Sequence, residues 1–271
     1  MPFTVSHPAA VLPLARSGLV SSALVIGSTV PDVFYYLPMP RSIEITLSNR
    51  THTTAGVFGL DLALGLALFL IWQVLVAPLA VAAAPGALRA RLAPDLPVPW
   101  RRHLAGPKSV LLVVVSLWIG AATHVFWDEF THPHRLGYRN IRWLATPHGP
   151  LIGYAWAQYA SGVIGAALIG LWLWFWWRAA PVADPVAHPQ RVPALTSRAW
   201  AVVATTVIGA GLAGVIAGAV SGWLAEHSVH AVLYRLATWG GGAWLFAILA
   251  CALIHAVTTA AAEPERAASV G

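Results

Sequence analysis

The sequence predicts an all-α, polytopic transmembrane helical bundle of five or six spans, with a polar His/Asp cluster at one membrane face. Hydrophobic residues form 58% of the 271 residues and charged residues only 10%, whereas soluble domains average about 25% charged residues. The mean hydropathy is +0.69, and apolar segments long enough to cross a bilayer use up most of the chain. We expect one integral membrane domain over 1–271, comprising a metal-site half (1–150), packing helices (151–260) and a flexible tail (261–271).

Six apolar segments are candidate spans. The first, 9–27, contains Pro13 and Arg16, so a re-entrant or interfacial helix is an alternative to a span. The other five have the length of about 20 residues that a bilayer core requires. These five segments are 55–83, 109–130, 153–177, 199–223 and 236–260.

Basic residues in the loops indicate the orientation in the plasma membrane. The loops 84–108 and 178–198 carry Arg or Lys and are rich in Pro and Ala, so the positive-inside rule places them in the cytoplasm. The segments 28–52, 131–152 and 224–235 then lie on the outer face. We therefore interpret the net charge of +6 as a topology signal and as a source of attraction to membrane lipids. We expect no nucleic acid as a partner.

The fifth span contains Gly214, Gly218 and Gly222 at four-residue spacing. Small residues at this spacing let membrane helices approach closely. Packing inside the molecule is the preferred interpretation, and a homo-oligomer through this glycine face is the alternative.

The composition limits the kind of metal site. The single cysteine, Cys251, lies in an apolar run, so a cysteine-based zinc site is excluded. A metal ion would therefore be held by His and carboxylate side chains, which suit zinc, manganese or iron. No motif indicates an organic cofactor.

The strongest candidate for a metal site is the pair His124 and Asp128. Residues four apart share one face of a helix, so both side chains can hold one cation, and Thr131 falls on the same stripe. Pro133 disfavours helix at the preceding residue, so we expect the helix to end at His132, whose side chain can turn toward the same site. A hydrogen-bonded His–Asp pair that caps the helix end is the alternative.

Other His and Asp residues are expected to converge on this pair. Asp32, His52 and His148 all fall on the outer face in the topology above, as do His124 and its neighbours. Ionisable side chains at membrane depth are costly and tend to be functional. The sequence therefore predicts a shared site.

Two further residues depend on the paths of their helices. His7 can join the site only if 9–27 bends or lies along the surface, because a straight span would place it about 37 Å from Asp32. Asp61 lies inside the second span, where a buried ion pair with Arg16 is the preferred interpretation and a proton relay the alternative.

Four motifs carry a family resemblance: MPFTVSHPAAVLPL at 1–14, GSTVPDVFYY at 27–36, THT at 51–53 and THVFWDEFTH at 123–132. Together they resemble an uncharacterised bacterial integral membrane family, catalogued only as a domain of unknown function. More distantly, the pattern looks like the membrane-bound metal-dependent hydrolases, which are similar to zinc-dependent phospholipase C.

The distant resemblance implies a set of metal ligands for one or more ions, zinc above all. The matching positions in this chain are His7, Asp32, His52, His124, Asp128 and His132. The sequence departs from that pattern, because Asp128 and His132 are closer than in the soluble phospholipases. In addition, His148 has Ile152 where a second His-x-x-x-Glu would need a glutamate.

The first functional hypothesis is metal-assisted hydrolysis of a phosphoester, free or lipid-linked, at the outer membrane surface. Asp128 and Glu129 are the candidate catalytic carboxylates, with Glu129 as the base. The guanidinium groups that could hold the phosphate are those of Arg50, Arg135, Arg139 and Arg142. A non-enzymatic metal-binding transporter, sensor or scaffold is the competing class; transporter sites usually lie near the bilayer midplane.

Overall fold

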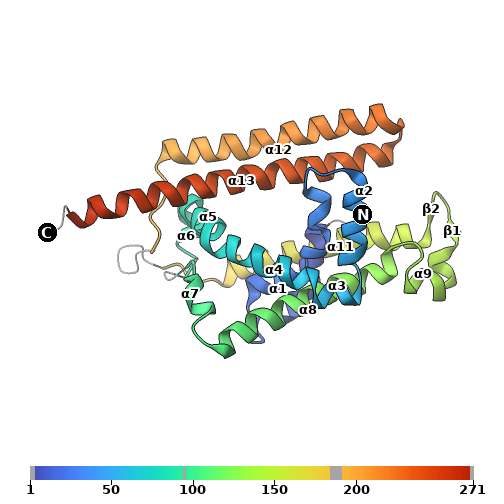
Figure 1. The fold of residues 1–271 in the computed structure, drawn as a ribbon, viewed down its shortest axis with the longest axis horizontal. Helices are drawn as coiled ribbons and strands as arrows, with labels where there is room; N and C mark the ends of the chain where they lie inside the picture. The colour runs from blue at the N-terminus through green and yellow to red at the C-terminus, as the bar shows by residue number, and fades with distance from the viewer. Residues whose placement is uncertain (1–3, 94–95, 184–190, 269–271) are drawn as a thin grey trace. The chain divides into compact units, whose positions relative to one another are not determined.

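The structure is a computed structural model that describes residues 4–93, 96–183 and 191–268. This part of the chain is helical almost throughout and forms two compact units (Figure 1). The first unit is Met1–Phe69 with Arg101–Ala179, and the second is Leu70–Trp100 with Ala180–Gly271. The long helix α4 (Leu60–Ile71) runs from the first into the second.

The first unit consists of short helices followed by two long ones. Its elements besides α4 are η1 (Thr4–Leu14), α1 (Ser21–Gly27), η2 (Val30–Tyr36), α2 (Arg41–Thr51), α3 (Thr54–Phe58), α7 (Trp100–His103), α8 (Pro107–Thr131), α9 (Leu136–Asn140), α10 (Arg142–Ala145), the two-residue strands β1 (Pro147–His148) and β2 (Leu151–Ile152), and α11 (Gly153–Ala179). The strands form one antiparallel turn.

The second unit is built on a helical hairpin. Its elements are the π-helical turn η3 (Trp72–Val76), α5 (Ala77–Ala83), α6 (Gly86–Arg89), α12 (Ser197–Glu226) and α13 (Val229–Ala268). Leu79 of α5 packs with Cys251 and Ala252 of α13 in a small core. Helix α13 continues to Ala268, through most of the segment predicted to be a flexible tail, and residues 269–271 lie outside the described residues.

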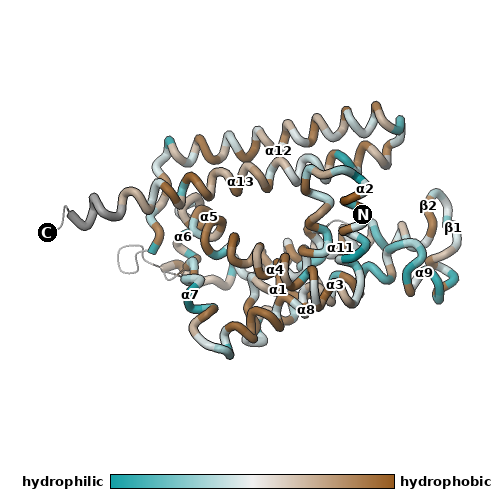
Figure 2. Tube along the Cα trace, in the orientation of Figure 1, coloured by the Kyte–Doolittle hydropathy of each residue, from teal (hydrophilic) through white to brown (hydrophobic). Residues whose placement is uncertain are grey.

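Among the described residues, five helical segments are long and apolar enough to cross a membrane. They are Leu60–Ala83, Pro107–Asn140, Gly153–Ala179, Ser197–Glu226 and Ala231–Ala262. They confirm the last five predicted spans, and the chain is a multi-pass membrane protein. Figure 2 shows the hydrophobic stretches along α4 and α8.

For segment 9–27, the sequence left open whether it forms a straight span or a re-entrant or interfacial helix. It is divided between the 3₁₀ helix η1 and the seven-residue α1, so it is not one of the candidate spans. Pro8 and Pro13 lie inside η1, and Gly18 between the two helices has a φ of 83°, which favours glycine. The chain therefore bends where a straight span would have carried His7 to the opposite membrane face.

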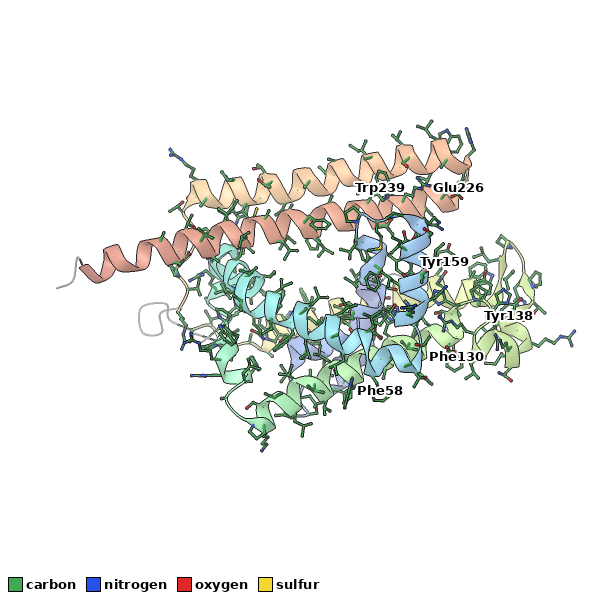
Figure 3. All side chains as sticks on the ribbon, viewed as in Figure 1. Phe58, Phe130, Tyr138, Tyr159, Glu226 and Trp239 are labelled. Atoms are coloured by element: carbon green, nitrogen blue, oxygen red, sulfur yellow. The ribbon has the colours of Figure 1, made fainter. Side chains whose placement is uncertain are left out.

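Large apolar side chains point outward from the spans of both units. Tyr159 in the first unit and Trp239 in the second, both labelled in Figure 3, are 45% and 48% exposed. Only 33% of the most apolar window of Pro107–Asn140 and 6% of that of Ser197–Glu226 are buried within the protein. A soluble protein seldom exposes apolar surface on this scale, and a bilayer would cover it.

Close packing of α1 against α8 forms the core of the first unit. Ala23, Phe69, Val113 and Leu117 form a buried cluster. A Cβ atom on Gly120 would lie 2.8 Å from the Cα of Gly27, so both helices need glycine at this crossing. The crossing brings the end of α1 to the face of α8 that carries His124.

The glycine face of α12 is occupied within the second unit. A Cβ on Gly214 would lie 2.6 Å from the carbonyl oxygen of Trp239, and one on Gly222 would lie 2.7 Å from that of Ala231. Gly218 faces the backbone of Arg235 in the same way. These contacts with α13 correspond to the internal packing that the spacing favoured.

Gly218→Ala is expected to lower the thermal stability of the protein in detergent, because the added methyl group overlaps the α13 backbone. Overpacking of this kind costs about 1–3 kcal/mol. Gly209→Ala is the matched control on the same helix, since a Cβ atom added there would have no neighbouring atom within 4 Å. Equal melting temperatures for the two variants would contradict the packing described.

Candidate metal centre

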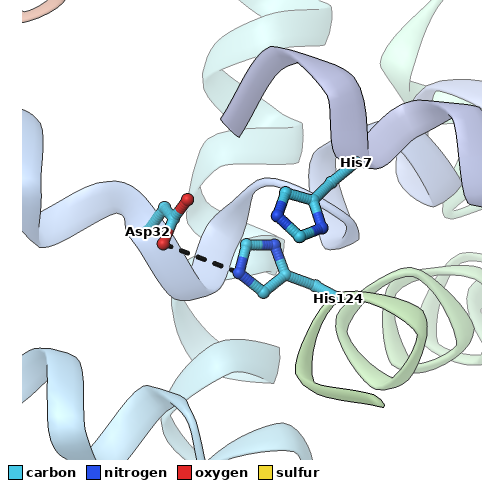
Figure 4. A group of neighbouring side chains, drawn as sticks. All are labelled: His7, Asp32 and His124. Atoms are coloured by element: carbon cyan, nitrogen blue, oxygen red, sulfur yellow. Dashed lines mark ion pairs between the residues drawn. The ribbon is translucent and has the colours of Figure 1, made fainter. Parts of the chain in front are cut away.

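Four elements of the first unit bring His and Asp side chains together. His7 lies on η1, Asp32 on η2, His52 at the C-terminal end of α2, and His124 and Asp128 on α8. All five are buried, with 0–5% of each residue exposed. Figure 4 shows three of them, with Asp32 and His124 joined as an ion pair. We call these five residues the His/Asp cluster.

Local sequence explains how each side chain reaches the cluster. Thr51 Oγ1 donates a hydrogen bond of 2.7 Å to the carbonyl oxygen of Pro31, which fixes the end of α2 beside η2 and so sets His52 against Asp32. His124 and Asp128 share one face of α8, as their spacing predicted. Helix α8 ends at Thr131, and His132 is extended with φ −127° and ψ 151°, which confirms the expected end before Pro133.

Two imidazoles and two carboxylates lie at the centre of the cluster. His52 Nε2 lies 3.3 Å from Asp32 Oδ1 and 3.2 Å from Asp128 Oδ2. His124 Nε2 lies 3.5 Å from Asp32 Oδ1 and 3.6 Å from Asp128 Oδ2. Zinc bonds of about 2.0–2.1 Å in a tetrahedron place ligand atoms about 3.3–3.4 Å apart. The four distances are close to this spacing, and His52, His124 and Asp128 offer three ligand atoms that all lie within 4.8 Å of one another.

The other nitrogen of each central imidazole is held by the backbone. His124 Nδ1 lies 2.8 Å from the carbonyl oxygen of Ser28, and His52 Nδ1 lies 2.7 Å from that of Ser48. A carbonyl only accepts, so each Nδ1 must carry the proton and donate. Metal-binding histidines are typically oriented in this way, which leaves the Nε2 atoms to face the carboxylates.

His7 and His132 border this centre on the Asp128 side. His7 Nε2 lies 3.8 Å from Asp128 Oδ1, and its ring stacks on that of His124 with centroids 3.7 Å apart. His132 Nδ1 lies 3.4 Å from the same oxygen, and its side chain is 25% exposed. Candidate ligand atoms group within 4.8 Å as His7, Asp32 and His124, and as His52, His124 and Asp128.

The pKa values outside the spans reflect burial and the paired charges. Burial lowers the pKa of His7 to about 4, assisted by the neighbouring His124, so the ring is neutral near pH 7. Burial also disfavours charge on His52, but its contacts with Asp128 and Asp32 raise its pKa to about 9. Burial would raise the pKa of Asp32, yet His124 and His52 hold it well below its usual range.

Three buried atoms of the cluster have no hydrogen-bond partner within the described chain: His7 Nε2, His124 Nε2 and Asp128 Oδ2. Buried polar atoms are normally paired, and leaving one unpaired costs about 1–3 kcal/mol. A cation between the Nε2 of His124 and the Oδ2 of Asp128 would satisfy both. The donor set therefore fits a divalent metal ion.

A comparison with known protein families shows which family the chain belongs to. The family model described as "Domain of unknown function (DUF4184)" matches residues 1–253. The chain belongs to this family. No curated protein and no solved structure matches the chain.

In this DUF4184 chain, His148, predicted as a metal ligand, and Glu129, predicted as a catalytic base, each bond to residues outside the His/Asp cluster. His148 Nε2 lies 2.9 Å from the carbonyl oxygen of Trp143 and the ring stacks on that of Trp143, and His148 is in neither metal-ligand group of the described residues. Glu129 accepts from the N–H of Leu136 at 2.8 Å and from Arg135 at 3.3 Å. It thereby holds the start of α9.

The four predicted phosphate-binding arginines divide into two kinds. Arg135 Nη1 donates to the carbonyl oxygen of His52 at 2.7 Å, so it lies beside the cluster. Arg50, Arg139 and Arg142 are exposed on the surface of the first unit. Of the four predicted arginines, Arg135 is therefore the one whose contacts place it beside the cluster.

Asp61 differs from its predicted environment. It is 2% exposed, and neither carboxylate oxygen has a hydrogen-bond partner within the described chain. The expected pair with Arg16 is not formed, because Arg16 lies in the turn after η1 instead of in a span.

The DUF4184 chain also contains supporting residues that sequence reasoning did not assign. Thr4 Oγ1 donates to Asp32 Oδ2, and the hydroxyl of Tyr36 donates to Thr4 Oγ1 at 2.8 Å. Because Oδ2 accepts from Thr4, Asp32 presents Oδ1 to His52 and His124. The motifs at 1–14 and 27–36 contain both residues, but nothing in their spacing reveals this contact.

Thr4→Val is expected to weaken zinc affinity about 10–100-fold, the usual effect of removing a group that orients a metal ligand. Thr4→Ser keeps the hydroxyl and should restore the affinity. Competition with a chromophoric zinc chelator measures both. Equal affinities of the valine and serine variants would show that the Thr4 hydroxyl has no such role.

Proposed function

We propose that the His/Asp cluster binds a divalent metal ion, most favourably zinc, and that the protein uses it to hydrolyse a phosphoester at the outer face of the plasma membrane. The observation that carries the metal site is the set of N···O distances of 3.2–3.6 Å among four buried side chains. Two of the atoms involved, on His124 and Asp128, otherwise have no hydrogen-bond partner within the described chain.

The ligand set supports hydrolytic chemistry. Two histidines with one carboxylate are a combination that catalytic zinc sites use, and His52, His124 and Asp128 form such a group. A divalent ion bound there would lower the pKa of a coordinated water and stabilise charge on phosphoryl oxygens. His132 and Arg135 lie beside the group at intermediate exposure, so they are suited to meet a substrate.

The position of the cluster supports a surface reaction over transport. His124 and Asp128 lie in the C-terminal third of α8, nearer in the chain to the predicted outer segment 131–152 than to the predicted cytoplasmic loop 84–108. Transporters usually place their sites near the bilayer midplane on broken helices. In the predicted topology, the cytoplasmic loops 84–108 and 178–198 would lie on the opposite side of the membrane from the outer segment 131–152.

A non-enzymatic metal-binding function is the second candidate, and one observation favours it. Asp32 Oδ1 lies 3.3 Å from His52 Nε2 and 3.5 Å from His124 Nε2 as a further protein oxygen beside the group, and the four central side chains are at most 6% exposed. Structural zinc sites are closed by four protein ligands, whereas catalytic sites keep one position for water. A closed site would suit a sensor or scaffold.

Detergent-purified protein tests the two candidates together. Elemental analysis should find bound zinc, and the zinc-loaded protein should hydrolyse phosphodiester and phospholipid substrates at a rate that the metal-free protein lacks. Bound zinc without turnover of any such substrate would favour the sensor or scaffold. Protein without bound metal, even after incubation with zinc, would rule out both.

A further inference from the structure

A small groove lies beside the cluster in the first unit, between η1, α8 and α11. It encloses about 130 Å³, and an apolar cavity of roughly 150 Å³ holds a benzene-sized hydrocarbon. Most of its lining residues are apolar, among them Ala9, Ala10, Trp127, Ile164 and Leu168, and His7 also lines it. The groove therefore fits a short length of hydrocarbon.

Two polar groups of the groove wall, on Trp127 and Ser161, already have partners, whereas His7 Nε2 has none within the described chain. Trp127 Nε1 donates to Ser161 Oγ at 3.1 Å, and Ser161 Oγ donates to the carbonyl oxygen of Gln158 at 3.1 Å. A polar occupant would find these groups engaged, whereas a hydrocarbon chain needs no partners. Away from His7, the wall thus selects by shape and apolarity.

One groove-lining side chain, Ile164, and side chains next in sequence to the lining are exposed and would face the bilayer. Phe126, Val163 and Ile164 are 58–71% exposed, and they belong to the candidate spans Pro107–Asn140 and Gly153–Ala179. In a membrane these residues would contact lipid hydrocarbon. An occupant can therefore enter the groove from the bilayer without crossing water.

His7 links the groove to the metal centre. Its ring lines the groove, while its Nε2 lies 3.8 Å from Asp128 Oδ1 and its ring stacks on that of His124. A molecule whose chain lies in the groove would have its polar end next to the cluster. The arrangement suits a lipid whose phosphoester head group lies a few atoms from its hydrocarbon chain.

We propose that the groove binds the hydrocarbon chain of a membrane phospholipid and presents its phosphoester to the His/Asp cluster. This inference rests on the proposed hydrolase function for its chemical consequence, but the binding itself can be tested separately. It names the substrate class: a lipid phosphoester from the bilayer, in contrast to a water-soluble phosphoester.

Photolabelling tests the groove in the intact protein. The wild type is reconstituted into phosphatidylcholine nanodiscs that contain a phospholipid with a diazirine in its acyl chain, and labelled peptides are quantified after irradiation. We expect peptides around Ala10 and Ile164 to be labelled about tenfold more than lipid-facing peptides of α12.

Matched tryptophan variants identify the site. Ala10→Trp fills the groove from η1 and should reduce this labelling about tenfold, and Ile164→Trp does so from α11 if the first variant fails to fold. Leu171→Trp, on an α11 residue that is 52% exposed and outside the groove lining, should leave the labelling unchanged. Uniform labelling of all lipid-facing helices, or labelling that both groove variants leave intact, would overturn the proposal.

The outcomes separate this inference from the proposed function. Photolabelling requires neither metal nor turnover, so groove-specific labelling of a protein that binds no zinc supports the lipid site and refutes the hydrolase. A zinc-dependent hydrolase without groove-specific labelling refutes the lipid site alone.

Discussion

Asp128→Asn is expected to abolish stoichiometric zinc binding, with a loss of affinity greater than about 100-fold. Removing residues that merely orient ligands costs about 10–100-fold, and Asp128 contacts the centre directly. Its Oδ2 lies 3.2 Å from His52 Nε2 and 3.6 Å from His124 Nε2. The amide keeps the shape of the side chain but removes one of the two buried negative charges that would balance the ion.

Elemental analysis of purified protein measures this loss, and His148→Ala is the matched control. His148 was predicted as a ligand from its place on the predicted outer face, but it stacks on Trp143 and is bonded to the backbone there. We expect the His148 variant to retain the full zinc content. If Asp128→Asn retained zinc while His148→Ala lost it, the cluster would not be the metal site.

The spans and the α8 motif could be predicted because each depends on one segment of chain. Length and hydropathy suffice for the five long helices, which the structure confirms. The spacing of His124 and Asp128 suffices for their shared face, and Pro133 for the end of the helix. These are local properties that a sequence displays directly.

The membership of the cluster could not be predicted in full because it depends on tertiary contacts. His52 and His148 both follow a Thr or Pro in a predicted outer segment, yet only His52 is anchored beside Asp32, through Thr51 and Pro31. For His7 the deciding feature is the bend after η1, which is a 3₁₀ helix and therefore lacks the period of an α-helix.

The unit to which each helix belongs also depends on tertiary contacts, which the sequence does not display. Helix α11 was placed by sequence with the packing helices of 151–260, but it belongs to the unit that carries the cluster. A Cβ on Gly165 of α11 would lie 2.9 Å from Ser6 on η1, next to His7. A glycine in a predicted span indicates close packing without naming the partner helix.

The last expected result concerns stability. Zinc should stabilise the folded protein by about 2.7 kcal/mol when its free concentration is 100 times the dissociation constant, because an ion that binds only the folded state shifts the folding equilibrium. The physical reason lies in the buried charges: Asp32 and Asp128 are each 1% exposed. Buried carboxylates are costly unless they are paired or bind a metal.

Thermal unfolding in detergent at increasing zinc concentration measures this effect. The melting temperature of the wild type should rise with zinc and fall when a chelator is added. The Asp128→Asn variant should show no dependence on zinc, whereas Gly209→Ala, which changes α12 far from any ligand in the sequence, should respond as the wild type does. A zinc-dependent rise of equal size in Asp128→Asn would mean that the ion stabilises the protein from another site, and the assignment of the His/Asp cluster as the metal centre would fail.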